Sequence, residues 1–382
     1  MESDEALDRR LYSPYGPVRL TAQAWAQPAS RLAVSGHIDA QTGKMTKAYA
    51  DFMARDVMLH MLEAVRPLAQ TDPGLAAAMQ SEIFKLKSWI FAWGMYCACG
   101  RELFEFSPGL VEALKHTDVG ETKLDGLRLP FQSFYIRFGP QPDLSYDYED
   151  QQAYADGAFF SFQVDPSDPD TGSLIICITM ALASGQGFLT PGPEFTIKGE
   201  DFHVPVDQAI ESAAQHAISR ADELHEMLMT NPNGPAAHMA EGIKVTVDES
   251  AAMVRRAMPL LVNALYYLSD LPRGKARAGS DTPEILKEKF DRAASPKAAN
   301  KLRSNFLSEG YAIVRLCGEE FERQEDGGAS GAARSAHWRR GHWRDQRYGA
   351  QHALTKRIWI RPVRVNPDHP DPDAPGHLYK VT

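Results

Sequence analysis

The chain has 382 residues, of which 43% are hydrophobic and 24% are charged, and its formal net charge is −9. This composition is ordinary for a folded globular protein and excludes a wholly disordered, collagen-like or fibrous chain. At this length the sequence can form one large core or two structural units, and we take two units as the starting expectation. Four cysteines are too few for a disulfide framework, which favours a reducing compartment.

The sequence shows no targeting or membrane segment. Its first ten residues, MESDEALDRR, are largely charged and lack the pattern of a signal peptide. The longest apolar stretch, Ala257–Leu268, is shorter than a membrane span and contains Pro259 and Asn263. These features predict a cytoplasmic protein, in a bacterial host cell, that does not contact a membrane.

The first half of the chain predicts two helices followed by strands. Residues 1–44 are punctuated by proline and glycine, so we expect an irregular N-terminal arm. Apolar positions repeat at helical spacing over residues 46–70 and again over 75–99, where Gly100 is the expected left-handed C-cap. Short β-rich runs separated by turn residues then predict antiparallel strands at Phe131–Phe138, Phe159–Val164, Leu174–Leu182 and Glu194–Ile197.

The second half returns to helical patterns. One begins at Asp207, the expected N-cap, and runs to about Met229. Another is expected over Glu249–Leu268. A polar stretch follows, with a short helix around Pro283–Ala293 and then a strand at Tyr311–Leu316.

The C-terminal part is expected to form a separate basic element. The small-residue run 325–333 predicts a hinge. Arg357–Val365 interleaves arginine with β-branched and aromatic residues, as in a half-buried strand, and Pro362 limits that strand to a sheet edge. We therefore expect an α+β fold with an irregular arm, a helical and antiparallel-sheet body, a connector, and a basic strand-containing element. These four units span residues 1–44, 45–272, 273–325 and 326–382, respectively.

Charge and tryptophan concentrate in the C-terminal element. Residues 327–364 contain nine lysine or arginine residues against one acid, Asp345, so this segment carries +8 and the rest of the chain −17. Arginine binds phosphates and carboxylates through paired hydrogen bonds, and interleaved aromatic rings can stack on bases or fill a partner's pocket. We predict a binding surface for RNA, the ribosome or an acidic protein. It comprises His337, Trp338, Arg339, Arg340, His342, Trp343, Arg344, Arg347, Trp359 and Arg361.

Three other interpretations of this cluster stay open. Its tryptophans could attach the segment to the body while the arginines face water. His337 and His342 could bind a metal ion, although their spacing fits no zinc motif. The same histidines could be the general acid and base of a toxin-like ribonuclease. Because histidines in basic regions more often bind than catalyse, binding is the leading hypothesis, and no catalytic residue, metal or cofactor is assigned.

The heptapeptide His337-Trp-Arg-Arg-Gly-His-Trp343 resembles the C-terminal signature of the anti-CRISPR proteins directed against the type V-A (Cpf-type) CRISPR nuclease. The resemblance continues through Arg357–Asn366, where that family also has a strand rich in arginine and aromatic residues. Weaker similarity brings the coverage to about half of the chain. It lies at Trp93-Gly94, Phe104–Arg137, Val206–Leu228 and Met258–Pro272.

The resemblance implies a non-enzymatic regulator from a phage or mobile element. Its implied partner is the nuclease polypeptide, recognised through its N-terminal region as it is synthesised. Production of the nuclease would then fall through loss of its messenger RNA. The longer N-terminal arm, the Asp-rich stretch 141–172 and the small-residue hinge depart from the family pattern.

Overall fold

The computed structural model describes the chain from residue 99 to residue 365 with short gaps, together with a few segments before it. The described ranges are 15–18, 63, 66–71, 92–96, 99–148, 151–164, 172–185, 188–189, 193–229, 237–270, 276–293, 295–308, 311–322 and 337–365. Most of the expected N-terminal arm lies outside these residues, as does the expected hinge. Most of the helix expected over 46–70 lies outside them as well. Near its end the structure describes the short helix α6 (Leu68–Thr71).

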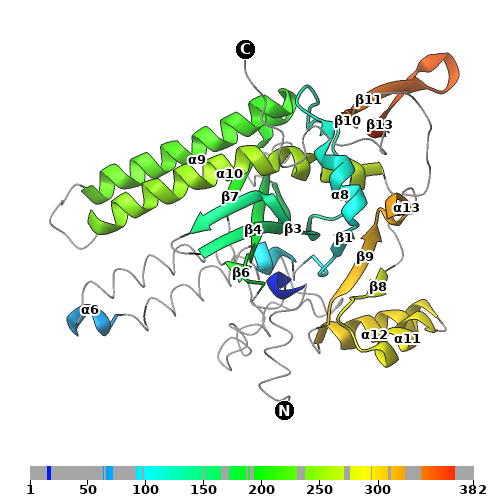
Figure 1. Cartoon of the computed structure of the whole chain (residues 1–382), viewed down its shortest axis with the longest axis horizontal. Coiled ribbons are helices and arrows are strands. Elements are labelled where there is room, and N and C mark those ends of the chain that lie inside the picture. The colour runs from blue at the N-terminus through cyan, green and yellow to red at the C-terminus, as the bar shows by residue number, and fades with distance from the viewer. Residues whose placement is uncertain are drawn as a thin grey trace.

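A mixed β-sheet forms the centre of the protein (Figure 1). Within the described ranges it has eight strands, ordered β6-β5-β4-β3-β1-β9-β8, with β7 also paired to β5. They are β1 (Leu103–Phe106), β3 (Ser133–Tyr148), β4 (Gln151–Val164), β5 (Gly172–Leu182), β6 (Phe188–Leu189), β7 (Glu194–Lys198), β8 (Ala276–Ala278) and β9 (Ile313–Cys317). Consecutive antiparallel pairing of β3, β4 and β5 confirms the expected antiparallel sheet, whereas β1 pairs in parallel with both β3 and β9.

Both faces of this sheet are buried. Side chains alternate along its strands, so that Phe134 and Phe160 belong to the main core cluster and Tyr135 and Phe159 to a second cluster on the other face. The second cluster includes Tyr15 from the N-terminal part of the chain. Aromatic and β-branched residues in adjacent strands thus account for the long central strands.

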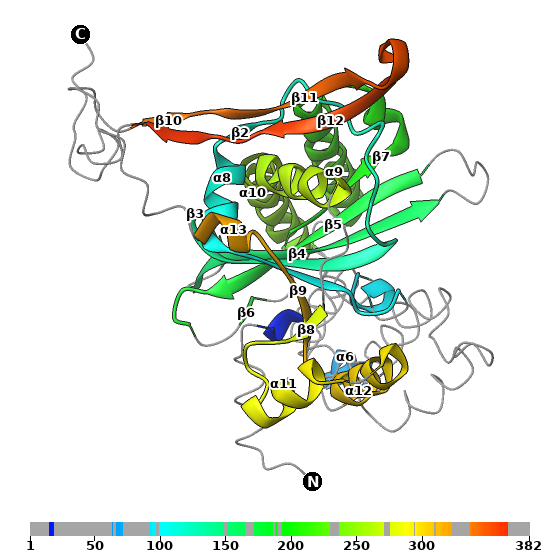
Figure 2. The same ribbon diagram turned by 90° about the vertical axis from the view of Figure 1, so that its right-hand side faces the viewer.

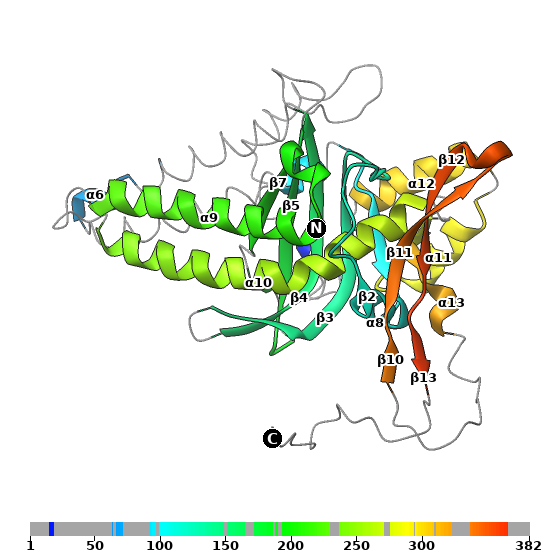
Figure 3. The same cartoon turned by 90° about the horizontal axis from the view of Figure 1, so that it is seen from above.

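Helices α8 (Pro108–Lys115), α9 (Val206–Met229) and α10 (Ala237–Asp270) cover one face of the sheet. Helix α8 begins after Ser107, whose hydroxyl accepts a hydrogen bond from the backbone N–H of Leu110. The expected N-cap Asp207 is wrong, because α9 begins one residue earlier and Asp207 lies in its first turn. Helix α10 is longer than expected and continues through Pro259. Seen from above, α9 and α10 run side by side beyond the sheet (Figure 3).

Helices α11 (Glu284–Asp291) and α12 (Pro296–Ser308) lie beyond the opposite face, near β8 and β9 (Figure 2). Of the helix expected over residues 75–99, the structure describes residues 92–96, which are helical. Gly100 has the expected positive φ, 100°. The backbone N–H of Arg101 then donates to the carbonyl of Tyr96, which closes the helix end. Two short helical turns, η3 (Gly199–His203) and α13 (Glu319–Glu322), follow β7 and β9.

The segment 273–325, expected as a connector, supplies two strands of the main sheet. β9 lies between β1 and β8, with Leu103 opposite Val314. The main sheet therefore includes strands from both the expected body and the expected connector. Sequence alone misses this because a parallel partner more than two hundred residues away leaves no local pattern.

The C-terminal element is a two-stranded antiparallel ribbon, and each of its two sides is divided into a short and a long strand. It comprises β10 (His337–Arg339), β11 (Gly341–Tyr348), the short turn η4 (Ala350–His352), β12 (Leu354–Ile360) and β13 (Val363–Val365). The strand expected over Arg357–Val365 is interrupted at Pro362, which has no N–H for a ladder. β11 pairs with β12, and β10 pairs with β13. We call residues 337–365 the C-terminal ribbon; Figure 2 shows helices α8, α9 and α10 between it and the main sheet.

Candidate binding surface on the C-terminal ribbon

The ribbon is joined to the body through backbone pairing. β11 pairs in parallel with β2 (Thr117–Asp118), the strand that follows α8, and the Gly341 N–H donates to the carbonyl of His116 at 2.9 Å. A Cβ atom at Gly341 would lie 2.7 Å from Cδ of Pro362 and 2.8 Å from the carbonyl oxygen of Ile360. The glycine in the Arg-Arg-Gly-His signature is therefore required by close backbone packing.

Trp343 is part of the main core. Only 9% of its surface is exposed, and its indole Nε1–H donates to Oδ1 of Asn263 at 2.7 Å. Asn263 is itself fully buried in α10, and its Nδ2 donates to the carbonyls of Leu114 at 3.0 Å and Thr117 at 2.8 Å. A buried amide that uses its oxygen and both N–H groups leaves no polar atom unpaired, so this contact fixes the position of the ribbon on α8 and α10.

Trp359 lies directly across the ribbon from Trp343. The two indole rings stack with centroids 5.7 Å apart, and Nε1–H of Trp359 donates to Oγ1 of Thr117 at 3.0 Å. Tyr267 and Phe321 contact the other side of the Trp359 ring. Two tryptophans of the predicted binding surface thus face the body, not solvent.

Trp338 also turns towards the body. Its ring stacks on the imidazole of His116, with centroids 4.5 Å apart and planes 18° from parallel. His116 in turn lies 2.9 Å from Glu112, one turn earlier on α8. The three tryptophans of the ribbon consequently attach it to the body, as one of the open interpretations supposed.

Two arginines of the ribbon are engaged in the same attachment. Arg357 forms a bidentate pair with Asp345, at 3.0 and 3.4 Å, and also donates to the carbonyl of Lys123. Partial burial is the largest single influence and lowers the pKa of the Arg357 guanidinium. The hydrogen bond to Asp345 and the charges of Tyr266, Asp345 and Asp125 together raise that pKa above its ordinary value. Arg361 lies over the ring of Phe321 and pairs with Glu320 at 3.6 Å.

The opposite side of the ribbon carries two further cations, Arg344 and Lys356. Because side chains alternate along a strand, His342, Arg344 and Lys356 project away from the body, opposite to Trp343 and Trp359. We define this outer face of β11 and β12 by its eight residues, His342, Arg344, Gln346, Tyr348, Leu354, Lys356, Ile358 and Ile360. Of these, Tyr348 and Leu354 at the tip are 42% and 53% exposed.

Five exposed cations of the ribbon, among them Arg344 and Lys356 of the outer face, differ from Arg357 and Arg361 in their partners. Over the described ranges no carboxylate forms an ion pair with Arg339, Arg340, Arg344, Arg347 or Lys356, all of which are exposed. Arg344 donates to the neutral amide of Gln346, and the Lys356 ammonium lies over the ring of Tyr348. These five charges are thus not neutralised by the body, unlike those of Arg357 and Arg361.

The structure separates the ten predicted site residues into two groups. Trp338, Trp343, Trp359 and Arg361 contact the body, whereas Arg339, Arg340, His342, Arg344 and Arg347 are exposed. The backbone of His337 pairs with Val365, and its side chain lies outside the described part. Sequence reasoning missed Asn263 and Thr117; a lone asparagine within the apolar stretch 257–268 was the available signal, because a buried amide requires partners.

The described part of the chain offers neither a cluster of metal ligands nor a helix that could span a membrane. In that part of the chain no three histidine, cysteine, aspartate or glutamate side chains are grouped so as to hold a metal ion. The helices described there are too short or too polar to cross a membrane.

Comparison with known proteins identifies the family. The profile of the anti-CRISPR type V subtype A2 family, described as AcrVA2-like, matches residues 104–367. A crystal structure of AcrVA2 aligns with a TM-score of 0.46 and 11% identity, over 91% of this chain and 97% of that chain, a similarity too low to relate individual residues. The comparison with curated proteins gives no match. Because the family profile spans most of the chain, including the whole ribbon, the protein belongs to the anti-CRISPR type V subtype A2 family.

Proposed function

We propose that this protein is an anti-CRISPR regulator that lowers production of the type V-A CRISPR nuclease, and that the outer face of its ribbon contacts RNA in doing so. Membership of the subtype A2 family supports the first part of the proposal. The second part is carried by one observation: five exposed cations of the ribbon, two of them on the outer face, have no carboxylate partner among the described residues. The nuclease polypeptide, recognised while it is being synthesised, is the proposed target, and loss of its messenger is the proposed outcome.

The side chains on the outer face suit a phosphate backbone better than a protein surface. Protein interfaces depend on buried aromatic anchors, and Trp338, Trp343 and Trp359 are already used inside this molecule. The outer face carries the cations Arg344 and Lys356 and one aromatic ring, Tyr348, near the tip, beside His342, Gln346 and the aliphatic side chains of Leu354, Ile358 and Ile360. Cations attract phosphates without regard to sequence, and an exposed ring can stack on an unpaired base.

The distribution of charge along the chain also favours a contact between the ribbon and RNA. Residues 327–364 carry +8 and the rest of the chain −17. A polyanion is therefore attracted to the ribbon and repelled by the body, which orients the encounter. An acidic protein would feel the same field, and the experiment has to distinguish the two.

Binding of a fluorescent single-stranded RNA, followed by anisotropy over a range of salt concentrations, tests the contact. We expect Arg344→Gln with Lys356→Gln to weaken binding and to reduce the salt slope by about 1.4, since each lost phosphate contact removes about 0.7. Lys297→Gln with Lys301→Gln is the matched control, because it removes the same charge from exposed positions of α12, on the far side of the sheet.

Two results would contradict this contact. One is equal loss of binding in both double variants, which would indicate a general effect of net charge. The other is displacement of the RNA by polyglutamate at the same concentration of charge, which would identify an acidic protein as the partner.

The ribonuclease alternative is disfavoured by the strand geometry. His337 and His342 are five residues apart on extended strands, which separates their Cα atoms by about 16 Å. A general acid and base that act on one phosphodiester must both reach it within hydrogen-bond distance. We therefore propose that the messenger is removed by other factors, and purified protein should leave RNA uncut.

A further inference from the structure

A cleft lies at the end of two inner strands of the main sheet, apart from the outer face of the ribbon. It has a volume of about 540 Å³, within the range of ligand-binding pockets. It forms where β1 and β9 end, beside the first turn of α8, and where the pairing of β3 with β4 shifts register between Arg137 and Gln141. Gly139, with φ of 75°, lies within this bulge.

The charged side chains of the cleft are mostly acidic. Glu105, Glu112 and Glu319 line it together with a single cation, Arg137. Arg137 donates to Glu105 at 2.9 Å and lies 3.8 Å from Asp156 behind it. Asp156 is 1% exposed, and its Oδ2 has no hydrogen-bond partner within the described structure. Two carboxylates therefore more than neutralise Arg137, and the cleft favours a cation over an anion.

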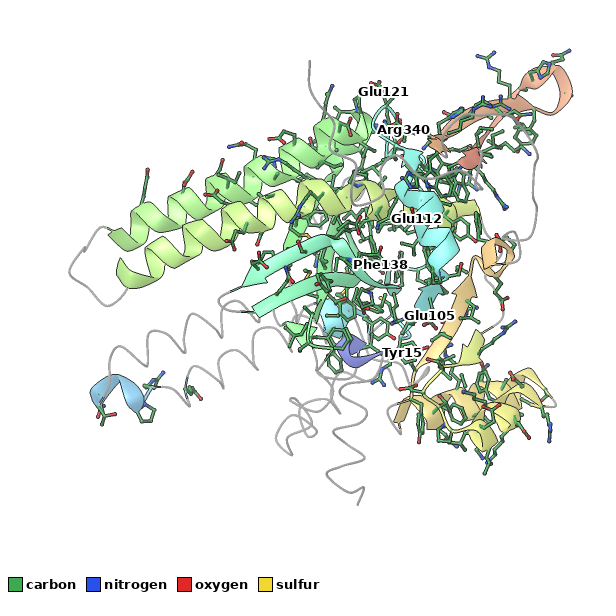
Figure 4. All side chains as sticks on the ribbon, in the orientation of Figure 1. Tyr15, Glu105, Glu112, Glu121, Phe138 and Arg340 are labelled. Carbon is green, nitrogen blue, oxygen red and sulfur yellow. The ribbon has the colours of Figure 1, made fainter. Side chains whose placement is uncertain are left out.

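The acids at the rim are accessible. The side chains of Glu112 and Glu319 are 49% and 48% exposed, and each has one surface partner, His116 and Arg277 respectively. Exposed pairs of this kind contribute little to stability, so a ligand cation can replace the partner at small cost. Figure 4 labels Glu112, Phe138 and Glu105, which come from α8, β3 and β1, respectively.

The walls between these acids are partly apolar, with Ser107, Gln141 and Cys317 as their polar members. Val111, Phe138 and Leu316 line the cleft with Phe106, and none of them offers a side-chain hydrogen bond. An amphipathic cation satisfies both features, because its methylene stem packs against apolar walls while its charged end reaches the carboxylates at the rim.

We propose that this cleft binds a lysine or arginine side chain of a polypeptide segment, with the stem against Val111 and Phe138 and the charged head towards Glu112 and Glu319. The volume accommodates more than one side chain, so residues beside the basic one lie within it as well. This site uses none of the ribbon's outer cations and does not depend on the proposed contact with RNA.

Peptides of one sequence that differ at a single position test the proposal on the full chain. The central residue of the blocked peptide Ala-Leu-Xaa-Leu-Ala is lysine, arginine or Nε-acetyl-lysine, and binding is measured by titration calorimetry. We expect the lysine and arginine peptides to bind at least about tenfold more tightly than the acetylated one, because acetylation removes the charge and keeps the stem. Glu112→Gln with Glu319→Gln should abolish that difference.

A matched control separates local from general charge effects. Glu211 pairs with Arg255 at 2.8 Å on α9, outside the cleft, as Glu319 pairs with Arg277 at 2.8 Å. Glu211→Gln should leave the preference for lysine unchanged, and Glu112→Lys with Glu319→Lys should favour a peptide with central glutamate. Equal binding of the lysine and acetyl-lysine peptides would overturn the proposal. So would an unchanged preference in the double glutamine variant, or binding of free spermidine as tight as that of the lysine peptide.

Discussion

Asn263 connects three separate parts of the structure at a single buried point. Its side chain receives the indole N–H of Trp343 from the ribbon and donates to carbonyls at the end of α8 and the start of β2. A hydrogen-bond network of this kind specifies one arrangement, because every displaced arrangement leaves a buried polar group without a partner. The position of the outer cations relative to the body therefore depends on a residue that is far from any solvent.

Replacing Trp343 by phenylalanine tests this dependence. The change keeps an aromatic ring but removes the donor, so Oδ1 of Asn263 becomes unsatisfied, and we expect a loss of about 1–3 kcal/mol in the free energy of unfolding. Trp338→Phe is the control, since Trp338 stacks on His116 at a partly exposed position, and it should cost less than about 1 kcal/mol. Urea denaturation measures both. Equal costs would show that the hydrogen bond to Asn263 does not matter.

Asp156 gives the protein a specific dependence on pH. Burial raises the pKa of its carboxyl to about 6 from 3.8, although the nearby Arg137 acts in the opposite direction. The folded protein therefore holds this proton more tightly than the unfolded chain does. Consequently, its contribution to stability falls as pH rises from about 4 to about 6, by about 3 kcal/mol in all.

Asparagine at position 156 does not titrate. Comparing the natural protein with the Asp156→Asn variant therefore isolates the effect of this carboxyl on stability. We expect the free energy of unfolding of the natural protein, relative to the variant, to decline between pH 4 and pH 6 and then to level off. Chemical denaturation at a series of pH values provides the measurement. Parallel curves for the two proteins would show that Asp156 titrates in its ordinary range.

The kinds of residue at the candidate site could be read from the sequence, whereas the direction in which each one points could not. The heptapeptide 337–343 marked the segment, but tryptophans that anchor a ribbon and tryptophans that anchor a partner have the same local pattern. Once β11 was known to begin at Gly341, alternation assigned Trp343 inward and His342 outward. Strand register, set by pairing with β2, was the missing information.

At the scale of elements, the ribbon is joined to the body more extensively than its sequence indicates. The hinge expected at 325–333 predicts that deletion of residues 326–382 leaves a folded body but removes function. The rings of Trp343 and Trp359, however, cover Tyr266, Tyr267 and Phe321. Without the ribbon these aromatic side chains would face water.

Deletion of residues 326–382 should therefore destabilise the remaining body. Loss of two buried indole contacts predicts a decrease of about 4 kcal/mol or more in the free energy of unfolding. Differential scanning calorimetry of the truncated chain tests this. A truncated protein that unfolds at the same temperature as the complete one would show that the ribbon is an independent module.

Local pattern predicted the long elements well and the short ones poorly. Strands β3, β4 and β5 are neighbours in sequence and are rich in aromatic and β-branched residues, so their antiparallel pairing was accessible. β8 has three residues, and β9 pairs with β1, which lies more than two hundred residues earlier, so neither pairing could be identified from the sequence. From the sequence, Pro362 predicted only that its strand lies at the edge of a sheet. In the structure Pro362 separates two strands, β12 and β13, which have different partners.

At the scale of the whole molecule, charge is divided between an acidic body and a basic ribbon. This division follows from composition alone, because residues 327–364, which include most of the ribbon, carry +8 and the rest of the chain carries −17. The structure adds that Arg357 and Arg361 are paired with Asp345 and Glu320, so fewer cations lack a partner than the nine lysine and arginine residues of the segment. The proposed contact with RNA depends on the cations that remain.

The most direct test of this account measures the messenger of a type V-A nuclease in cells that produce the protein. Two reporters are compared, one translatable and one with its start codon removed. We predict that the natural protein lowers only the translatable messenger, that Arg344→Gln with Lys356→Gln abolishes this effect while remaining folded, and that Lys297→Gln with Lys301→Gln retains it. Equal loss of both messengers, or full activity of the Arg344 and Lys356 variant, would contradict the account.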